Sequence, residues 1–438
     1  MNLRRVREPV QIGLALSPTE EKLRRRIEGD LSFKGCRTGY GPHNTHAFAA
    51  KFPPQLPRAF IDSLTDAGEI VLDPMVGSGT ALVEAVLAGR AAVGVDLDPL
   101  AVKISRAKCT PLDADAAALV AEQIADRARV WLSHAGKSGL EKLLAPFDPA
   151  TKEFLAYWFL PETLLELHAL ATGIRVLAPD AMRNFFEIVL SSVIVTKSGG
   201  VSLARDLAHS RPHKVTDKRI RSAIDVFQEK ALRAVASLAT LDGGAHSAVV
   251  LRGDSRALPI ESESVDLIVT SPPYASAIDY VRAHKFSLVW LGYTIPQLSQ
   301  ARRKYIGAEV GLEDASSVSS ETARSCLRAV AERDKNRSQV IARYFVDMHR
   351  SIQEMFRVLR PGRACIIVVG SSTVRGVNIL TQYALAEIAE AAGFRLVGVK
   401  ERQIDRDHRL MPISYNSSQS GIEARMHREH VIALVKPR

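Results

Sequence analysis

The chain has 438 residues, a formal net charge of +10 and 46% hydrophobic residues, as expected for a globular protein with two or three domains or with one domain and large insertions. No apolar stretch reaches the roughly 20 residues that span a bilayer, and the basic N-terminus lacks the apolar core of a signal peptide, which predicts a cytoplasmic protein. The four cysteines form no Cys-x-x-Cys pair, so no metal site is predicted, and the positive charge favours a polyanionic partner.

A glycine-containing turn follows the first predicted sheet strand. The apolar run over 70–73 ends at Asp73, and Gly77 and Gly79 precede a helix that begins near Thr80. Glycines let the backbone approach a ligand, and a helix N-terminus presents free N–H groups. The turn lacks both the G-x-G-x-x-G spacing and a Walker lysine, so a carboxylate or sugar ligand is favoured over phosphate.

Two further strands are followed by acids. A strand over 91–96 ends at Asp96, about 20 residues after the glycines, where doubly wound folds place an acid on ribose hydroxyls. A lone acid there can also be a simple helix cap. A later strand over 249–252 precedes Asp254. Parallel strands would bring these acids to one carboxyl edge of a sheet, where ligands bind.

The strand predicted over 265–270 runs into Ser271, Pro272, Pro273 and Tyr274. Consecutive prolines fix φ and donate no backbone hydrogen bond, so the chain there is stiff. Carbonyl acceptors beside an aromatic ring can hold a planar amino group. A plain turn is the alternative reading of the same four residues.

Two long segments interrupt the strand pattern. Residues 110–247 show apolar positions at helical spacing, and residues 295–345 are polar and also largely helical in pattern. Within the first segment we predict four helices, over 114–135, 151–177, 180–196 and 217–241.

The combined motifs resemble class I S-adenosylmethionine-dependent methyltransferases that modify amino groups of DNA bases. Asp73 to Thr80 is similar to their cofactor motif Asp-Pro-Phe-x-Gly-Ser-Gly-Thr, with Met75 in place of Phe. Asp96 matches the ribose-binding acid, Asp254 the acid near the adenine amino group, and Ser271 to Tyr274 the catalytic motif. The resemblance covers 41–108 and 248–438. It implies a doubly wound, Rossmann-like α/β sheet with large helical insertions and S-adenosyl-L-methionine as cofactor.

The segment over 46–56 resembles one that closes over the methionine end of the cofactor in such enzymes, which implies a covering role for Lys51 and Phe52. The residues so assigned to the cofactor are Phe52, Asp73, Pro74, Gly77, Gly79, Thr80, Asp96 and Asp254. Phe52 could equally be a core residue.

The resemblance also divides the chain. The expected parts are an N-terminal extension (1–40), core segments that carry the cofactor site (41–109), the catalytic loop (248–294) and the last strands (346–438), and insertions at 110–247 and 295–345. Relatives carry their target-recognition domain elsewhere, so the segment that reads DNA sequence is left open.

The expected activity is methyl transfer to an exocyclic amine, with Ser271 and the Pro272 carbonyl as acceptors and Tyr274 as the stacking face. Serine in the first place is commoner in enzymes acting on N4 of cytosine, with N6 of adenine as the alternative. Methylation at ring carbon 5 would need a thiolate, usually in Pro-Cys, and no cysteine follows a proline. N2 of guanine in RNA is a further alternative, although only about 65 residues precede the cofactor strand. The last alternative is a protein with this fold that binds nucleic acid but has no catalytic activity.

A base inside duplex DNA must flip out to reach such a slot, and its backbone needs a cationic surface. The candidate phosphate contacts are Arg205, Arg211, Lys214, Arg302 and Arg303. Each could instead lie on a solvated helix face. The sequence predicts neither the recognition site, nor a restriction partner, nor the oligomeric state.

Overall fold

The computed structural model describes residues 16–48, 51–136, 138–196, 200–205, 212–238, 248–275, 280–307, 313–370, 372–404 and 428–438. Within these ranges no helix is long and apolar enough to cross a membrane.

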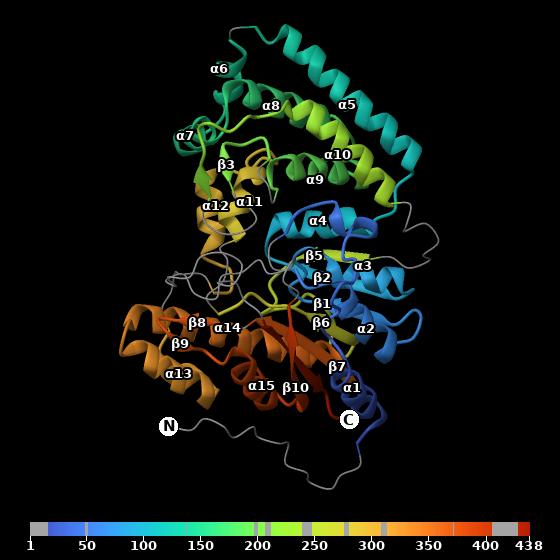
Figure 1. Cartoon of the computed structure of the whole chain (residues 1–438), viewed down its shortest axis with the longest axis vertical. Helices are drawn as coiled ribbons and strands as arrows, with labels where there is room; N and C mark the ends of the chain where they lie inside the picture. Colours follow the sequence, from blue (N-terminus) through green and yellow to red (C-terminus); the bar gives the residue numbers. More distant parts are fainter. Residues whose placement is uncertain are drawn as a thin grey trace.

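A seven-stranded sheet forms the centre of the molecule, in the order β10-β11-β7-β6-β1-β2-β5 (Figure 1). β11 runs antiparallel to both of its neighbours, and the other adjacent pairs are parallel. The predicted doubly wound α/β sheet is therefore confirmed. Its strands are β1 (Ile70–Asp73), β2 (Ala91–Asp96), β5 (Ala248–Arg252), β6 (Val265–Thr270), β7 (Leu359–Gly370), β10 (Arg395–Gln403) and β11 (Arg428–Val435).

The order of the strands reverses at β1. From β1 the chain moves outward through β2 to β5, then returns to β6 on the other side of β1. Crossovers of opposite direction leave a crevice at the carboxyl ends of the two central strands, and ligands of open α/β sheets bind there. The loops after β1 and β6 are the glycine loop and the Ser-Pro-Pro-Tyr segment.

Helices cover both faces of the sheet because successive strand residues point to opposite sides. Val71 of β1 belongs to the core that includes α2, α3 and α4, whereas Leu72 belongs to the core formed with α14 and α15. The helices packed on the sheet are α1 (Pro18–Glu28), α2 (Gln55–Leu64), α3 (Thr80–Leu87), α4 (Pro99–Cys109), α14 (Lys335–Val358) and α15 (Thr381–Ala391).

The first insertion forms a helical layer above α4, to which α9 connects it (Figure 1). The helix predicted over 151–177 is in fact two helices, because Pro161 cannot donate the hydrogen bond that a continuous helix requires and instead begins the second one. The last predicted helix begins only at Ala223. The elements are α5 (Ala114–His134), α6 (Gly139–Leu144), α7 (Pro149–Trp158), α8 (Pro161–Arg175), α9 (Ala181–Ile194), β3 (Ala204–Arg205), β4 (His213–Lys214) and α10 (Ala223–Leu238).

The second insertion is also helical in its described part. The boundary expected at residue 345 falls inside α14, which is one continuous helix. The remaining elements are the short 3₁₀ helices η1 (Gly41–Asn44) and η3 (Ala315–Ser317), the helices α11 (Tyr280–Leu288), α12 (Ile295–Arg302) and α13 (Glu321–Ala331), and the strands β8 (Thr373–Val374) and β9 (Val377–Asn378).

Gly94 of β2 allows α3 and the glycine loop to pack closely on the sheet. A Cβ at this position would lie 2.6 Å from Leu82 Cδ2 and 2.9 Å from Val76 Cγ2. We expect Gly94→Ala to lower the free energy of unfolding by about 1–3 kcal/mol through overpacking. Gly173→Ala in α8 is the matched control, because its Cβ would make ordinary 3.6 Å contacts with Ile124.

Denaturant unfolding measures both variants. The control should be neutral or more stable by up to about 1 kcal/mol, since alanine favours the helix over glycine. Equal effects of the two substitutions would contradict the close packing at Gly94.

Candidate active site

The glycine loop is folded back onto the end of β2. Gly77 and Gly79 have φ of +49° and +77°, a region that favours glycine. A Cβ on Gly79 would approach Ser105 Cα to 3.1 Å, so α4 packs directly beneath the loop. Gly79 then begins α3 as its N-cap, which leaves the first N–H groups of this helix at the crevice.

Asp96 ends β2 and accepts hydrogen bonds from the backbone on both sides. The Gly77 N–H donates to its Oδ2 over 2.8 Å and the Asp98 N–H to its Oδ1 over 2.9 Å. Burial, and then the charge of Asp98, raise the pKa of Asp96 to about 6. A half-buried carboxylate of this kind is stabilised by a ligand that donates hydrogen bonds to it.

Asp73 lies at the end of β1 and is buried. Its Oδ1 accepts from the Thr270 hydroxyl of β6 over 2.7 Å and from the Met75 N–H over 3.1 Å. Burial raises the pKa of Asp73 to about 7. Its side chain therefore joins the two strands that flank the crevice. Pro74 and Thr80 are also buried.

Asp254 follows β5 and is held by Arg256. The guanidinium donates to both carboxylate oxygens, over 2.9 and 2.7 Å, and also to Asp347 of α14 and to the Lys304 carbonyl. Burial alone would raise the pKa of Asp254, but the hydrogen bonds from Arg256 outweigh it and lower the pKa. Arg256 was not predicted from the sequence as a site residue, although it stands only two residues from Asp254.

The Ser-Pro-Pro-Tyr segment, which is the candidate catalytic loop, follows β6 directly. Ser271 and Pro273 are half-buried, and Pro272 is buried. Tyr274 is only 7% exposed, and its hydroxyl donates to Glu429 Oε1 of β11 over 3.1 Å. Glu429 was assigned no role from the sequence, and its distance along the chain gave no signal of this contact.

Two aromatic rings and a histidine lie over the glycine loop and the end of β2. Phe48 approaches the position of a Cβ on Gly77 to 3.2 Å and stacks on Tyr280 with ring centroids 5.3 Å apart. His284 of α11 bonds Asp98 Oδ2 over 2.6 Å. Phe48 and Phe52 both belong to the hydrophobic core, at 9% and 6% exposure, and it is Phe48 whose ring approaches Gly77.

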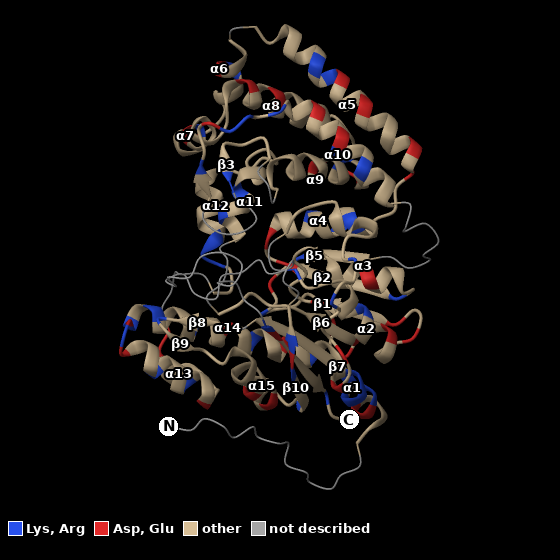
Figure 2. Ribbon diagram, in the orientation of Figure 1, with Lys and Arg blue, Asp and Glu red and all other residues tan. Residues whose placement is uncertain are grey.

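The residues predicted to contact phosphates differ in their exposure and in the contacts that they already make within the protein. Lys214 lies over the Tyr157 ring at 4.1 Å, and Arg205 is exposed on β3. Arg302 is half-buried and Arg303 is exposed at the end of α12. Figure 2 shows Lys and Arg positions along α11 and α12. Arg211 lies outside the described residues.

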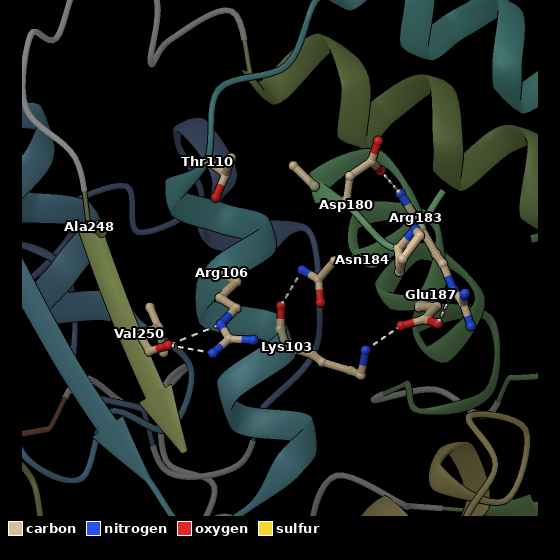
Figure 3. A pocket seen from close by; sticks show the side chains of 11 residues that line it. Lys103, Arg106, Thr110, Asp180, Arg183, Asn184, Glu187, Ala248 and Val250 are labelled. Carbon is tan, nitrogen blue, oxygen red and sulfur yellow. Dashed lines mark hydrogen bonds and ion pairs between the residues drawn. The ribbon is translucent and has the colours of Figure 1, made fainter. Parts of the chain in front are cut away.

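A separate cavity of about 530 Å³ lies between α4, α9 and β5 (Figure 3). Its charged groups are largely paired with one another: Glu187 binds both Lys103 and Arg183, and Arg106 donates to the Val250 carbonyl of β5. None of the residues from the glycine loop or the catalytic loop lines it. Nor do the described residues contain a cluster of side chains suited to a metal ion.

Comparisons with known proteins agree with the arrangement at the crevice. Residues 19–107 match a family model described as DNA methylase, for N6 and N4 methyltransferases. The chain is 24% identical to the Type II methyltransferase M.MvaI of Kocuria varians, over 84% of this chain and 86% of that protein. It is also 24% identical to the Type II methyltransferase M.AvaI of Nostoc sp. strain PCC 7120, over 75% and 73% of the two chains.

A solved structure, a SAM-dependent methyltransferase of Methanosarcina mazei, aligns over 86% of this chain and 97% of its own, at 10% identity and a TM-score of 0.31. A score this low does not establish the fold, which follows instead from the strand order. The family match, the curated relatives and the two loops at the crevice agree with the resemblance seen in the sequence: the chain is similar to S-adenosylmethionine-dependent DNA amino-methyltransferases.

Proposed function

We propose that the protein methylates N4 of cytosine in duplex DNA, at a specific sequence, as the modification enzyme of a restriction-modification system. One observation supports this proposal most strongly. The glycine loop and Ser271-Pro272-Pro273-Tyr274 follow two neighbouring central strands, β1 and β6, and so lie side by side at the carboxyl edge of the sheet. Serine in the first place of the second motif favours cytosine over adenine. The family match does not separate these two bases, so N6 of adenine is the competing outcome of the test.

The residues at the crevice suit S-adenosylmethionine. Gly77 and Gly79 allow close approach of the ligand, and α3 offers its free N–H groups. We assign Asp96 to the ribose hydroxyls, which donate to a carboxylate, and Asp254 to the adenine side, with Arg256 holding that carboxylate in place. When bound, the cofactor supplies a methyl group on a positively charged sulfur.

The protein's part in the chemistry is positioning. The lone pair of an exocyclic amine is delocalised into the ring, and it localises only as the nitrogen becomes tetrahedral. We assign Ser271 Oγ and the Pro272 carbonyl as acceptors for the two amino hydrogens, and Tyr274 as the wall against which the base stacks. Acceptors fixed before the reaction favour this change without a covalent intermediate.

Methylation at carbon 5 has no nucleophile in this chain. Cys109, Cys326 and Cys365 are buried, and burial raises the pKa of Cys109 to about 12. Cys36 is exposed, in the segment that follows α1. None of the four stands in a loop after a central strand, so no thiolate is available beside the catalytic loop.

DNA phosphates would meet the end of α12. The main chain there is fixed, because Arg256 donates to the Lys304 carbonyl over 2.7 Å and Arg343 to the Arg303 carbonyl over 3.4 Å. The Arg303 and Lys304 side chains are exposed, with no ion pair to a carboxylate among the described residues. We therefore assign the exposed Arg303 and Lys304 to the DNA phosphates, together with the exposed Arg205 and Lys214, and assign both insertions to DNA binding.

The affinity for the cofactor should depend on pH through Asp96. The ionised carboxylate of Asp96 accepts hydrogen bonds from the ribose better than the protonated acid does. Below the pKa of about 6, Asp96 must therefore release a proton when the cofactor binds, whereas at pH 8 it is already ionised and no proton is exchanged. We expect the Kd to fall as the pH rises from 5 to 6.5, by up to about tenfold per unit, and to level above about 7. Calorimetric titration across this range measures it, and a flat profile would contradict the assignment.

Methyl transfer from labelled cofactor to duplex DNA and to bulk RNA tests the proposed function. We expect label in DNA only. Labelled RNA with unlabelled DNA would instead support the guanine-N2 activity on this core. A protein that does not bind the cofactor at all would be a nucleic-acid-binding protein without activity.

A further inference from the structure

Tyr274 is fixed at both ends. Two prolines stiffen its backbone, and its hydroxyl donates to Glu429 Oε1 over 3.1 Å. Glu429 is the second residue of β11 and pairs with Gly370 at the carboxyl end of β7, so the ring reaches across β7 from the end of β6. Burial, and then the charge of Glu429, raise the pKa of Tyr274 well above its usual value, so the hydroxyl stays a donor at neutral pH.

Glu429 is itself held in place from the opposite side. Its Oε2 pairs with Arg402, its direct partner across the β10–β11 ladder, and both side chains are less than 10% exposed. Arg402 also donates to the carbonyls of Leu31 and Ser32, over 2.8 and 3.4 Å. An unbroken chain of hydrogen bonds thus leads from the segment after α1 to the catalytic loop.

The stability of the fold does not by itself explain why a buried ion pair stands at this position. Removing two charges from water costs several kcal/mol per ion, and apolar residues of similar volume are often equally or more stabilising at such a position. A buried ion pair does provide a fixed direction, because each oxygen of the carboxylate has one partner. The oxygen that faces Tyr274 therefore has a defined place, and so has the axis of the tyrosine side chain.

We propose that Glu429, held by Arg402, is a positioning residue for the methyl-transfer reaction, and that it fixes the Tyr274 ring where the flipped base stacks. Free rotation of Tyr274 about χ1 would let the ring leave the wall of the slot. The inference rests on the proposed function, since it concerns the same slot. It adds two residues, which lie on the last two strands of the chain.

Tyr274→Phe tests the proposal most cleanly, because it removes only the hydroxyl and leaves the Glu429–Arg402 pair intact. We expect kcat/KM for unmethylated genomic DNA to fall about tenfold, as for the loss of a hydrogen bond to a charged group, with an unchanged Kd for the cofactor. Tyr383→Phe is the matched control, since Tyr383 is 47% exposed and lies on α15, and it should behave as wild type.

A double-mutant cycle separates positioning from a merely structural role. Glu429→Gln should lower kcat/KM in the wild-type background and have less than a twofold further effect in the Tyr274→Phe background, because the two groups act through one bond. Effects that multiply, or a Tyr274→Phe enzyme within twofold of wild type, would overturn the inference alone. A wild-type protein that methylates no DNA would overturn the proposed function, and this inference with it.

Discussion

Replacing Tyr274 with alanine is expected to lower kcat/KM for DNA by about 10- to 100-fold, the effect of losing the stacking of a base on an aromatic ring. The Kd for the cofactor should stay within about twofold of wild type, because Tyr274 bonds to β11 and not to the glycine loop. Steady-state methyl transfer to unmethylated DNA measures the first quantity and calorimetry the second.

The control for this substitution is Tyr383→Ala, which removes the same side chain from an exposed position on α15. It should leave both quantities unchanged. Turnover by Tyr274→Ala equal to that of wild type would show that no base stacks on this ring, and the assignment of the catalytic loop would fail.

Asp96→Ala is expected to raise the Kd for the cofactor by about 100-fold. The carboxylate would lose its hydrogen bonds to the ribose, each of about 1.5–3 kcal/mol for a charged acceptor, and the loop would lose the bonds to the N–H groups of Gly77 and Asp98. Calorimetric titration with the cofactor measures the change. Asp96→Asn, which keeps a carbonyl acceptor, should fall between this variant and wild type.

Asp113→Ala serves as the control for Asp96→Ala. Asp113 is also an acid next to a helix, where its side chain caps α5 by accepting from the Ala116 N–H over 2.7 Å. Its loss should cost about 1 kcal/mol of stability and leave the Kd unchanged. A cofactor affinity of Asp96→Ala equal to that of the control would exclude the ribose assignment.

The sheet and its two loops could be predicted from the sequence because the signals are local. Glycines at positive φ, consecutive prolines and acids at strand ends act within a few residues of where they stand. The strand order then brings these local features to one edge. This is why the sequence alone predicts that Asp73, Asp96, Asp254 and the Ser-Pro-Pro-Tyr segment lie at one edge of the sheet.

Contacts between distant segments could not be predicted in this way. The choice of Phe48 over Phe52 depends on which ring faces Gly77, and both belong to the same apolar segment. The hydrogen bond between Tyr274 and Glu429 joins the segment after β6 to the last strand, and a single sequence gives no register for that strand. The break at Pro161 was a local signal that the apolar periodicity on both sides obscured.

The contact of His284 also could not be predicted from the sequence. Its helical position suits packing as well as function, and the structure shows a bond to Asp98, the N-cap of α4. The helix after the catalytic loop is thus tied to the loop after β2. This contact joins the proposed base slot to the proposed cofactor site.

Identification of the methylated base tests the central claim most directly. DNA treated with the protein and labelled cofactor is digested to nucleosides, and the labelled nucleoside is identified by chromatography and mass spectrometry. We expect the labelled nucleoside to be N4-methylcytosine. N6-methyladenine would support methyl transfer to an exocyclic amine but would show that the methylated base is adenine and not cytosine. Label in 5-methylcytosine, or in no DNA nucleoside, would contradict methyl transfer to an exocyclic amine of DNA.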